Sequence, residues 1–289
     1  MKPTNSGRTF LLVQIAAACV FAGRAWQHLF WDAPYRELLW DDVLMKPFIE
    51  KITPWTWHEF VTNLAVDEAI QQWMTGVGIF YALCAVLSLV IHRLPKFFRF
   101  FIGLGAAGLV FLALLYMKEH FFHLGQFFEF TLQFGSPIFL LLLSGKTFPL
   151  PKLVVWMKIA IALTFVCHGL YAIGYYPRPG IYFEMTMNIL NISQAATTTF
   201  LLTAGFLDFI VAIGIFLPWK WAKWFLLYAT FWGLATSLAR IAGNFYTELP
   251  WLSLHEWVHQ AVFRFPHFLI PLSVYIAMKK STSEVRSAP

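Results

Sequence analysis

Long apolar segments separated by short basic clusters dominate this chain of 289 residues. Charged residues make up 12% of the chain, about half the share of a soluble domain, and hydrophobic residues make up 59%. Segments such as 100–117 and 153–175 are long enough, at about 1.5 Å per residue, to cross a hydrocarbon layer about 30 Å thick. They are apolar throughout rather than alternating, so we expect helices, whose backbone groups pair within the segment. The sequence predicts an all-α integral membrane protein.

The apolar segments predict about eight membrane-spanning helices. Their approximate bounds are 10–30, 69–92, 98–117, 126–144, 153–175, 197–217, 222–241 and 254–278.

Lysine and arginine occupy every second connection between these segments. Because basic loops stay on the cytoplasmic side, we expect both termini to be cytoplasmic and the membrane to be a bacterial inner membrane. This topology also accounts for the net charge of +6, so a nucleic-acid partner is not expected. The basic residues are Lys2, Arg8, Arg93, Lys96, Arg99, Lys146, Lys152, Lys220, Lys223, Lys279, Lys280 and Arg286.

The connection 31–66 is long, acidic in balance and rich in tryptophan, and it falls on the opposite, outer side. We expect short helices in the membrane interface here, because tryptophan rings favour the headgroup level. The same loop is a candidate roof over an outer pocket and a candidate surface for a partner subunit. Its acidic and tryptophan residues are Asp32, Glu37, Asp41, Asp42, Glu50, Glu59, Trp31, Trp40, Trp55 and Trp57.

Two halves of the chain, 1–148 and 149–289, carry similar segments in the same order. With four spans each, they would be repeats of parallel topology, related by an axis near the membrane normal. Chance similarity between membrane helices of like composition is the alternative. The matched segments are 21–24 with 165–168, 78–81 with 205–208, and 137–140 with 266–269.

Ionisable residues inside the spans are the candidates for a functional site, because a charge at the bilayer centre costs about 2.5–3.5 kcal/mol on insertion scales. In a continuous last helix, Glu256, His259, Gln260 and His267 fall on one narrow face at about 100° per residue, with Arg264 beside them. The other spans carry Arg24, His28, Gln126, Glu129, Gln133, His168, Tyr171, Asp208 and Arg240.

Except for Asp208 and His267, these polar residues lie in the outer halves of their helices. We therefore predict a polar pocket in the outer leaflet. The alternative is structural: buried charges can hold helices together, through pairs such as Arg24–Glu129 or Asp208–Arg240, or extend to the headgroups.

Histidine allows a haem or a metal to be considered. His168 and His259 lie at similar depth in their helices and could serve as two axial ligands. The chain contains no CxxCH motif, and Cys19, Cys84 and Cys167 each stand alone in an apolar segment, as packing residues do. We predict no metal site and favour a quinone over haem, without assigning a cofactor.

The segment 162–171, ALTFVCHGLY, and the segment 205–208, GFLD, resemble the first two helices of the DoxX-like family of small four-helix membrane proteins. The similarity covers 153–278 best; in the first half Arg24 stands in place of His168, and Tyr81 in place of Asp208. The resemblance implies a four-helix unit, here in tandem. Members of the wider group include a subunit of thiosulfate:quinone oxidoreductase and methylamine-utilisation membrane proteins.

These observations predict a membrane component of an oxidoreductase or electron-transfer system that holds a quinone-like lipophilic molecule. A transporter or carrier for a small solute and a non-catalytic scaffold or assembly partner are the alternatives, and whether the chain is itself an enzyme stays open. The predicted catalytic residues are His168, His259, Asp208 and Glu129. The predicted ligand-binding residues are Arg24, His28, Tyr171, Arg240, Glu256, Arg264 and His267.

Overall fold

The computed structural model describes residues 5–145 and 148–287, with side chains for 7–145 and 148–279. Lys2 and Lys146 lie outside the described residues, as do the side chains of Lys280 and Arg286. Every regular element in the described part of the chain is a helix, which confirms the all-α prediction.

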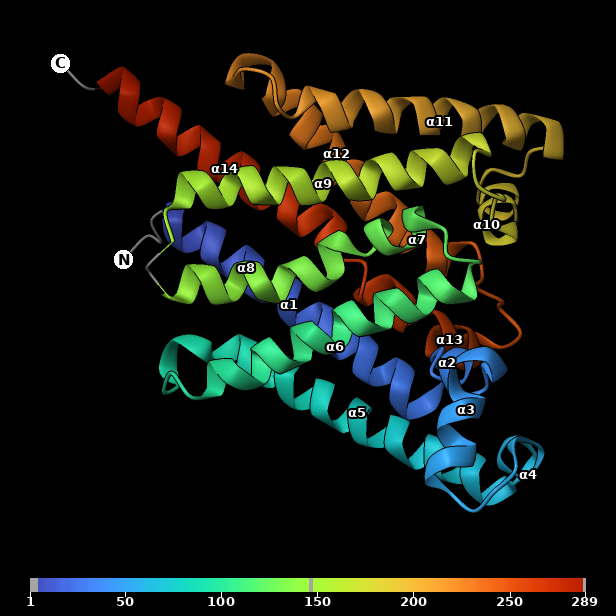
Figure 1. The fold of residues 1–289 in the computed structure, drawn as a ribbon. Coiled ribbons are helices and arrows are strands. Elements are labelled where there is room, and N and C mark those ends of the chain that lie inside the picture. The colour runs from blue at the N-terminus through green and yellow to red at the C-terminus, as the bar shows by residue number, and fades with distance from the viewer. Residues whose placement is uncertain (1–4, 146–147, 288–289) are drawn as a thin grey trace.

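Six long single helices and one broken pair form the bundle in Figure 1. The single helices are α1 (Asn5–Phe30), α5 (Leu64–Val90), α6 (Phe98–Glu119), α9 (Leu150–Ile173), α11 (Gln194–Gly214) and α12 (Trp219–Ala242), and the pair is α13 (Pro250–Val262) with α14 (Pro266–Ser287). The shorter helices are α2 (Arg36–Leu39), α3 (Asp42–Ile52), α4 (Trp57–Thr62), α7 (Leu124–Glu129), α8 (Thr131–Gly145), α10 (Gly180–Leu190) and the 3-10 turn η1 (Ile91–Arg93).

Seven candidate membrane spans occur among the described residues, with α13 and α14 counted together as one. This supports an integral membrane protein. The fourth predicted span, 126–144, is not among the seven, because the helix is interrupted at Phe130 and α8 has only 15 residues, about 22 Å. An eighth crossing by α7 and α8 therefore stays a prediction.

The last predicted span is interrupted as well. The chain turns at residues 263–265, and Pro266 then begins α14. Proline has no N–H for the preceding turn of helix and fits the first position of a new one. The prediction of one continuous helical face from Glu256 to His267 is therefore wrong: Glu256 lies on α13 and His267 on α14.

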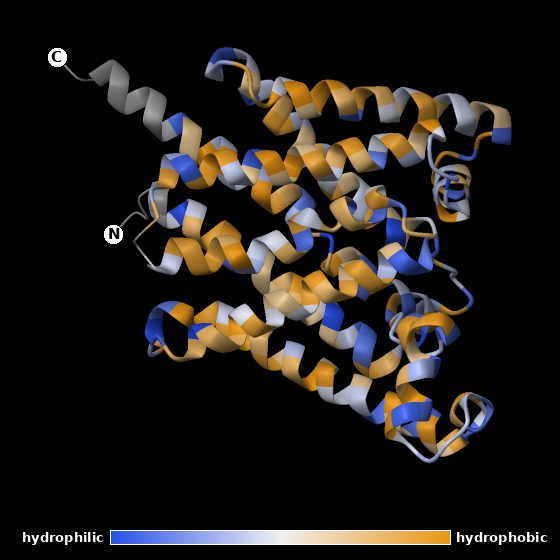
Figure 2. Cartoon of the chain, in the orientation of Figure 1, coloured by the Kyte–Doolittle hydropathy of each residue, from blue (hydrophilic) through white to orange (hydrophobic). Residues whose placement is uncertain are grey.

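The two ends of the bundle differ in character. The start of α1 and the end of α14 lie at one end, whereas α2, α3, α4, α10 and α13 gather at the other (Figure 1). Hydrophilic residues mark the α5–α6 and α11–α12 turns at the end that carries the termini (Figure 2). This matches the predicted alternation of basic turns, and the assignment of that end to the cytoplasm stays a prediction.

Helix α1 is central: it packs against α5, α8, α13 and α14. One hydrophobic core runs through both halves of the chain and includes Phe21, Tyr81, Met157 and Ile270. The halves follow a similar order of elements, each ending in a broken helix. The division at 148 and the duplication stay predictions.

Glycines allow α9 and α11 to approach each other closely. A Cβ atom on Gly205 would lie 2.9 Å from the carbonyl oxygen of Gly169 and 2.7 Å from Cγ2 of Ile173. A Cβ atom on Gly169 would in turn lie 2.9 Å from the carbonyl oxygen of Gly205. Such distances exclude a larger residue at either position unless the helices separate. The contact holds the adjacent residue His168 close to the helix that carries Asp208.

We expect Gly205→Ala to lower the unfolding temperature of the detergent-solubilised protein, because overpacking a close contact costs about 1–3 kcal/mol. Gly76→Ala on α5 is the matched control. A Cβ atom there meets nothing within 4 Å, and alanine favours a helix interior over glycine by about 1 kcal/mol. A Gly205→Ala protein as stable as the Gly76→Ala protein would contradict the close packing.

Candidate functional site

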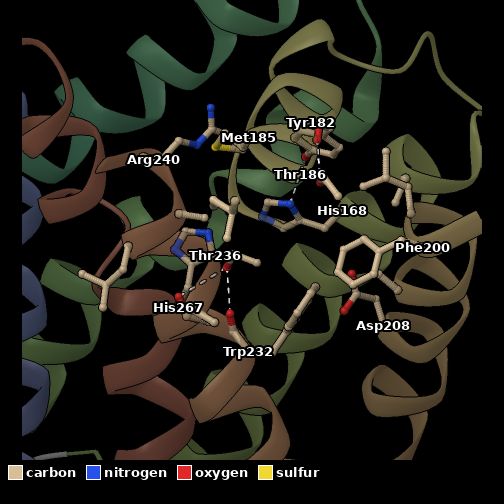
Figure 3. Close-up of a pocket in the computed structure, with 18 of the residues that line it drawn as sticks. His168, Tyr182, Met185, Thr186, Phe200, Asp208, Trp232, Thr236, Arg240 and His267 are labelled. Atoms are coloured by element: carbon tan, nitrogen blue, oxygen red, sulfur yellow. Dashed lines mark hydrogen bonds between the residues drawn. The ribbon is translucent and has the colours of Figure 1, made fainter. Parts of the chain in front are cut away.

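Two neighbouring cavities lie inside the bundle. The first, here called the apolar cavity, has a volume of about 360 Å³ and lies between α9, α10, α11, α12 and the start of α14 (Figure 3). Its walls are mostly apolar, with Phe165, Met185, Leu201 and Trp232 among them. The polar residues that line it are His168, Tyr182, Thr186, Asp208, Thr236, Arg240, Arg264 and His267.

The second cavity, here called the polar cavity, has a volume of about 250 Å³ and lies between the two halves of the chain. Tyr182, Arg240 and Arg264 line both cavities, so the two are adjacent. The polar cavity is further lined by Arg24, Gln27, Tyr116, His120, Gln126, Glu129, Phe130, Pro179, Ile181, His259, Gln260 and Phe263.

The apolar cavity reaches the surface between α10, α11 and α12. Ile189, Leu190 and Leu238 line it and are each exposed by more than two fifths. Helix α11 packs mainly on α9 and contacts α12 much less. The opening is therefore lateral and lined by aliphatic side chains, at the end of the bundle opposite the termini. A molecule could reach it from the surrounding lipid.

The Nε2 atom of His267 is a hydrogen-bond acceptor to which no described group donates. Its Nδ1 atom lies 2.7 Å from the carbonyl oxygen of Arg264. A carbonyl can only accept, so Nδ1 carries the hydrogen of the neutral ring and the lone pair is on Nε2. That Nε2 atom is buried and has no hydrogen-bond partner among the described residues.

His168 lies at the wall between the two cavities. Its Nδ1 atom is 3.2 Å from the hydroxyl oxygen of Tyr182, and its Nε2 atom is 3.7 Å from Oε1 of Glu129. The second distance exceeds a hydrogen bond, and Nε2 has no partner in the described part of the chain. Burial raises the pKa of Tyr182, so its hydroxyl keeps its proton and can donate to Nδ1. The imidazole of His267 meets that of His168 edge-on, with ring centres 5.6 Å apart (Figure 3).

Asp208 is the deepest charged group of the apolar cavity. Its side chain is 3% exposed, and Oδ1 is buried without a hydrogen-bond partner among the described groups. Leaving such a group unpaired costs about 1–3 kcal/mol, so a carboxyl group in this position needs an explanation. The predicted Asp208–Arg240 ion pair is wrong: Figure 3 shows the two residues at opposite ends of the cavity, and they share no contact within 4.0 Å.

Arg24 is held by neutral partners. Its Nη1 and Nη2 atoms each donate at 2.6 Å, to Oε1 of Gln27 and to Oε1 of Gln133, and its guanidinium lies 3.9 Å from the ring centre of Phe263. The predicted Arg24–Glu129 ion pair is therefore wrong. Amide oxygens and an aromatic face take the place that the carboxylate was expected to fill.

Three predicted ligand-binding residues line neither cavity. His28 is fully buried and both of its ring nitrogens have partners, the carbonyl oxygen of Arg24 at 2.7 Å and the hydroxyl of Tyr35 at 2.9 Å. Tyr171 is buried with an unpaired hydroxyl, and Glu256 is half-buried on α13. The arrangement of His28 suits a structural role, because nothing in its ring is left for a ligand.

The predicted catalytic residues divide between the cavities. His168 and Asp208 line the apolar cavity, whereas Glu129 and His259 line the polar one. His168 and His259 thus face different spaces, and His259 stacks on Trp31 with ring centres 6.3 Å apart. Among the described residues, no group of three or more His, Cys, Asp or Glu side chains is arranged to hold a metal ion.

Helix α10 contributes residues that sequence reasoning did not assign to the site. Tyr182, Met185 and Thr186 line the apolar cavity from this helix, and Pro179 and Ile181 line the polar one. The prediction that the 31–66 loop roofs the pocket is wrong, because none of its residues lines either cavity. Pro179 directly precedes α10, and a proline at this place is a recognisable sign of a helix start, but no pattern in the sequence indicates which way the helix folds.

No family model, curated protein or solved structure matches this chain. The candidate site rests on the geometry described above.

We expect Asp208→Leu to raise the stability of the unliganded protein by about 1–3 kcal/mol, because it removes an unpaired buried carboxyl group and its larger, similarly branched side chain can extend into the cavity. Gln133→Leu is the matched control and should lower stability, because it removes an acceptor of Arg24. Thermal unfolding in detergent measures both. A destabilised Asp208→Leu protein would show that the carboxyl group holds the fold together.

Proposed function

We propose that this protein binds a quinone-like lipophilic molecule in the apolar cavity, as a membrane component of an oxidoreductase or electron-transfer system. The observation that carries the proposal is the combination of a lipid-facing mouth with unpaired polar atoms deep in an apolar space. The mouth is formed by Ile189, Leu190 and Leu238, and the unpaired atoms belong to His168, Asp208 and His267. Ligand sites are commonly of this kind, apolar with a few convergent polar groups.

The polar groups suit a molecule that changes between carbonyl and hydroxyl. A quinol hydroxyl can donate to Nε2 of His267, and a quinone carbonyl can accept from the Nε2–H of His168 when Tyr182 donates to Nδ1. Neighbouring side chains bury both Nε2 atoms. A ligand oxygen would therefore reach them after a small rotation of the rings. Reduction of the quinone would take up two electrons and two protons. His168, with Glu129 3.7 Å away, and Asp208 are the groups placed to exchange the protons.

The electrons would come from a partner protein. The acidic, tryptophan-rich loop 31–66 is the proposed docking surface for it. Lys118 anchors this loop through Asp41 at 2.7 Å, and Arg36 joins Asp32 at 3.0 Å and Asp67 at 2.7 Å. The bond from Lys118 also lowers the pKa of Asp41, so the contact stays charged further into the acid range. A surface held in this way has a defined shape for a partner.

Transport is the less favoured function. A solute path would need polar groups toward the end of the bundle that carries the termini. There, the side-chain amide of Gln14 donates to the carbonyl oxygens of Ser88 and Leu89, so it is already satisfied. Solute counterflow in proteoliposomes distinguishes the two functions, since a ligand-binding subunit gives none.

We expect the purified protein to bind a short-chain quinone such as decylubiquinone, measured by quenching of tryptophan fluorescence, because Trp232 lines the cavity. His267→Phe and Asp208→Asn should each weaken binding about tenfold, the effect of losing one hydrogen bond to a buried polar group. Trp232→Phe should remove most of the quenching that the quinone causes.

His92→Gln is the control for loss of a histidine, because His92 is exposed in the α5–α6 turn, far from the cavity. Its affinity should equal that of the unmodified protein. The proposal fails if no saturable binding occurs, or if His267→Phe and Asp208→Asn bind as tightly as His92→Gln.

A further inference from the structure

The polar cavity concentrates positive charge. Arg24, Arg240 and Arg264 come from α1, from α12 and from the turn between α13 and α14, and all three line it. Glu129 is the one acidic residue among the lining residues. No carboxylate oxygen in the described part of the chain lies within 4.0 Å of any of the three guanidiniums. Even with the Glu129 carboxyl ionised, two positive charges are uncompensated.

Two of the three guanidiniums have donors to spare. Arg264 donates from Nη1 to the carbonyl oxygen of Gln260 at 3.2 Å, and its guanidinium lies 4.8 Å from the ring centre of Phe263. No described group accepts a hydrogen bond from the guanidinium of Arg240, although this residue is only 7% exposed. Each arginine carries five N–H donors in a planar fork. Nearly all the donors of this pair are therefore available to a molecule in the cavity.

Buried positive charge of this density is costly without an anion. Removing a charged group from water costs several kcal/mol unless an opposite charge or several hydrogen bonds replace the solvent. Arg24 meets this cost in part through Gln27 and Gln133, whereas Arg240 and Arg264 do not. An anion with several acceptor oxygens and about two negative charges would supply the missing partner.

We propose that the polar cavity binds a phosphate-type oxyanion, held by the guanidiniums of Arg240 and Arg264, with Arg24 behind them. Paired arginines match the oxygens of phosphate through two-pronged hydrogen bonds. A cavity of about 250 Å³ admits a phosphate group together with ordered water. Gln260 lines the same space, and its side-chain amide offers a neutral donor to the remaining oxygens.

The two cavities together fit an amphiphile. Tyr182, Arg240 and Arg264 form the wall that both share, so a headgroup between the arginines can continue into an apolar chain in the apolar cavity. A free phosphate ion offers the same oxygens without the chain. The site does not depend on the quinone proposal, since its charge excess exists whatever the apolar cavity holds.

Isothermal titration of the full-length protein in neutral detergent, at fixed ionic strength, tests the site with three probes. These are inorganic phosphate, dioctanoyl phosphatidic acid and dioctanoylglycerol, the last of which lacks the phosphate. Saturable binding of phosphatidic acid, with at least tenfold weaker binding of inorganic phosphate, identifies a lipid headgroup as the source. Comparable binding of both, in competition, identifies a free anion. Either result supports the oxyanion site.

We expect Arg240→Gln and Arg264→Gln each to weaken binding of the phosphate-bearing probe by about tenfold or more, because each removes a charge-assisted hydrogen bond. Both proteins should fold, since neither arginine has a carboxylate partner to lose. Arg178→Gln is the matched control: it removes a positive charge at the same end of the bundle but outside both cavities. Inorganic phosphate has no apolar part to enter the apolar cavity, so its binding tests this site separately from the quinone proposal.

The proposal is overturned if neither phosphate-bearing probe binds saturably, or if dioctanoylglycerol binds as tightly as phosphatidic acid. Equal binding by the folded Arg240→Gln, Arg264→Gln and Arg178→Gln proteins would also overturn it.

Discussion

The buried guanidinium of Arg24 joins the parts of the bundle on which the site depends. It donates hydrogen bonds to the side-chain oxygens of Gln27 on its own helix and of Gln133 on α8, and it lies against the ring of Phe263, which follows α13. In an apolar surrounding a charge persists only where the neighbouring structure solvates it. One side chain thus holds α1, α8 and the end of α13 in register around the polar cavity.

Unpaired buried polar atoms converge on the apolar cavity, although others in the described part of the chain, such as the hydroxyl of Tyr171, lie outside both cavities. Both ring nitrogens of His28 and the side-chain NH2 group of Gln14 have partners, and neither residue lines a cavity. Nε2 of His267 and Oδ1 of Asp208 are buried without a partner among the described residues, and both side chains line the apolar cavity. A buried polar group without a partner lowers the stability of the protein, and a ligand that supplies the missing hydrogen bond removes this cost. The geometry therefore favours a ligand site over a set of helix clasps.

Interrupted helices place the polar groups at the junction of the two cavities. The break at Phe130 puts Glu129 at the end of α7, 3.7 Å from His168, and the break at 263–265 puts Arg264 between α13 and α14. At such breaks, backbone carbonyls are free to bind side chains, as the carbonyl of Arg264 does with His267. Irregular backbone at this depth is tolerated where it lines a cavity rather than lipid.

The sequence by itself determined the helical class and the apolar segments, because both follow from local composition, and it predicted that the ionisable residues gather toward one end of the bundle. It also indicated His168 and Asp208, since charges within apolar segments are conspicuous. Only the tertiary structure decided that Arg24 pairs with amides rather than with Glu129, and that α10 rather than the 31–66 loop closes the site. Both the partner of a buried charge and the direction of a loop depend on which surfaces meet when the helices pack. A single sequence does not record the distances between segments that lie far apart along the chain.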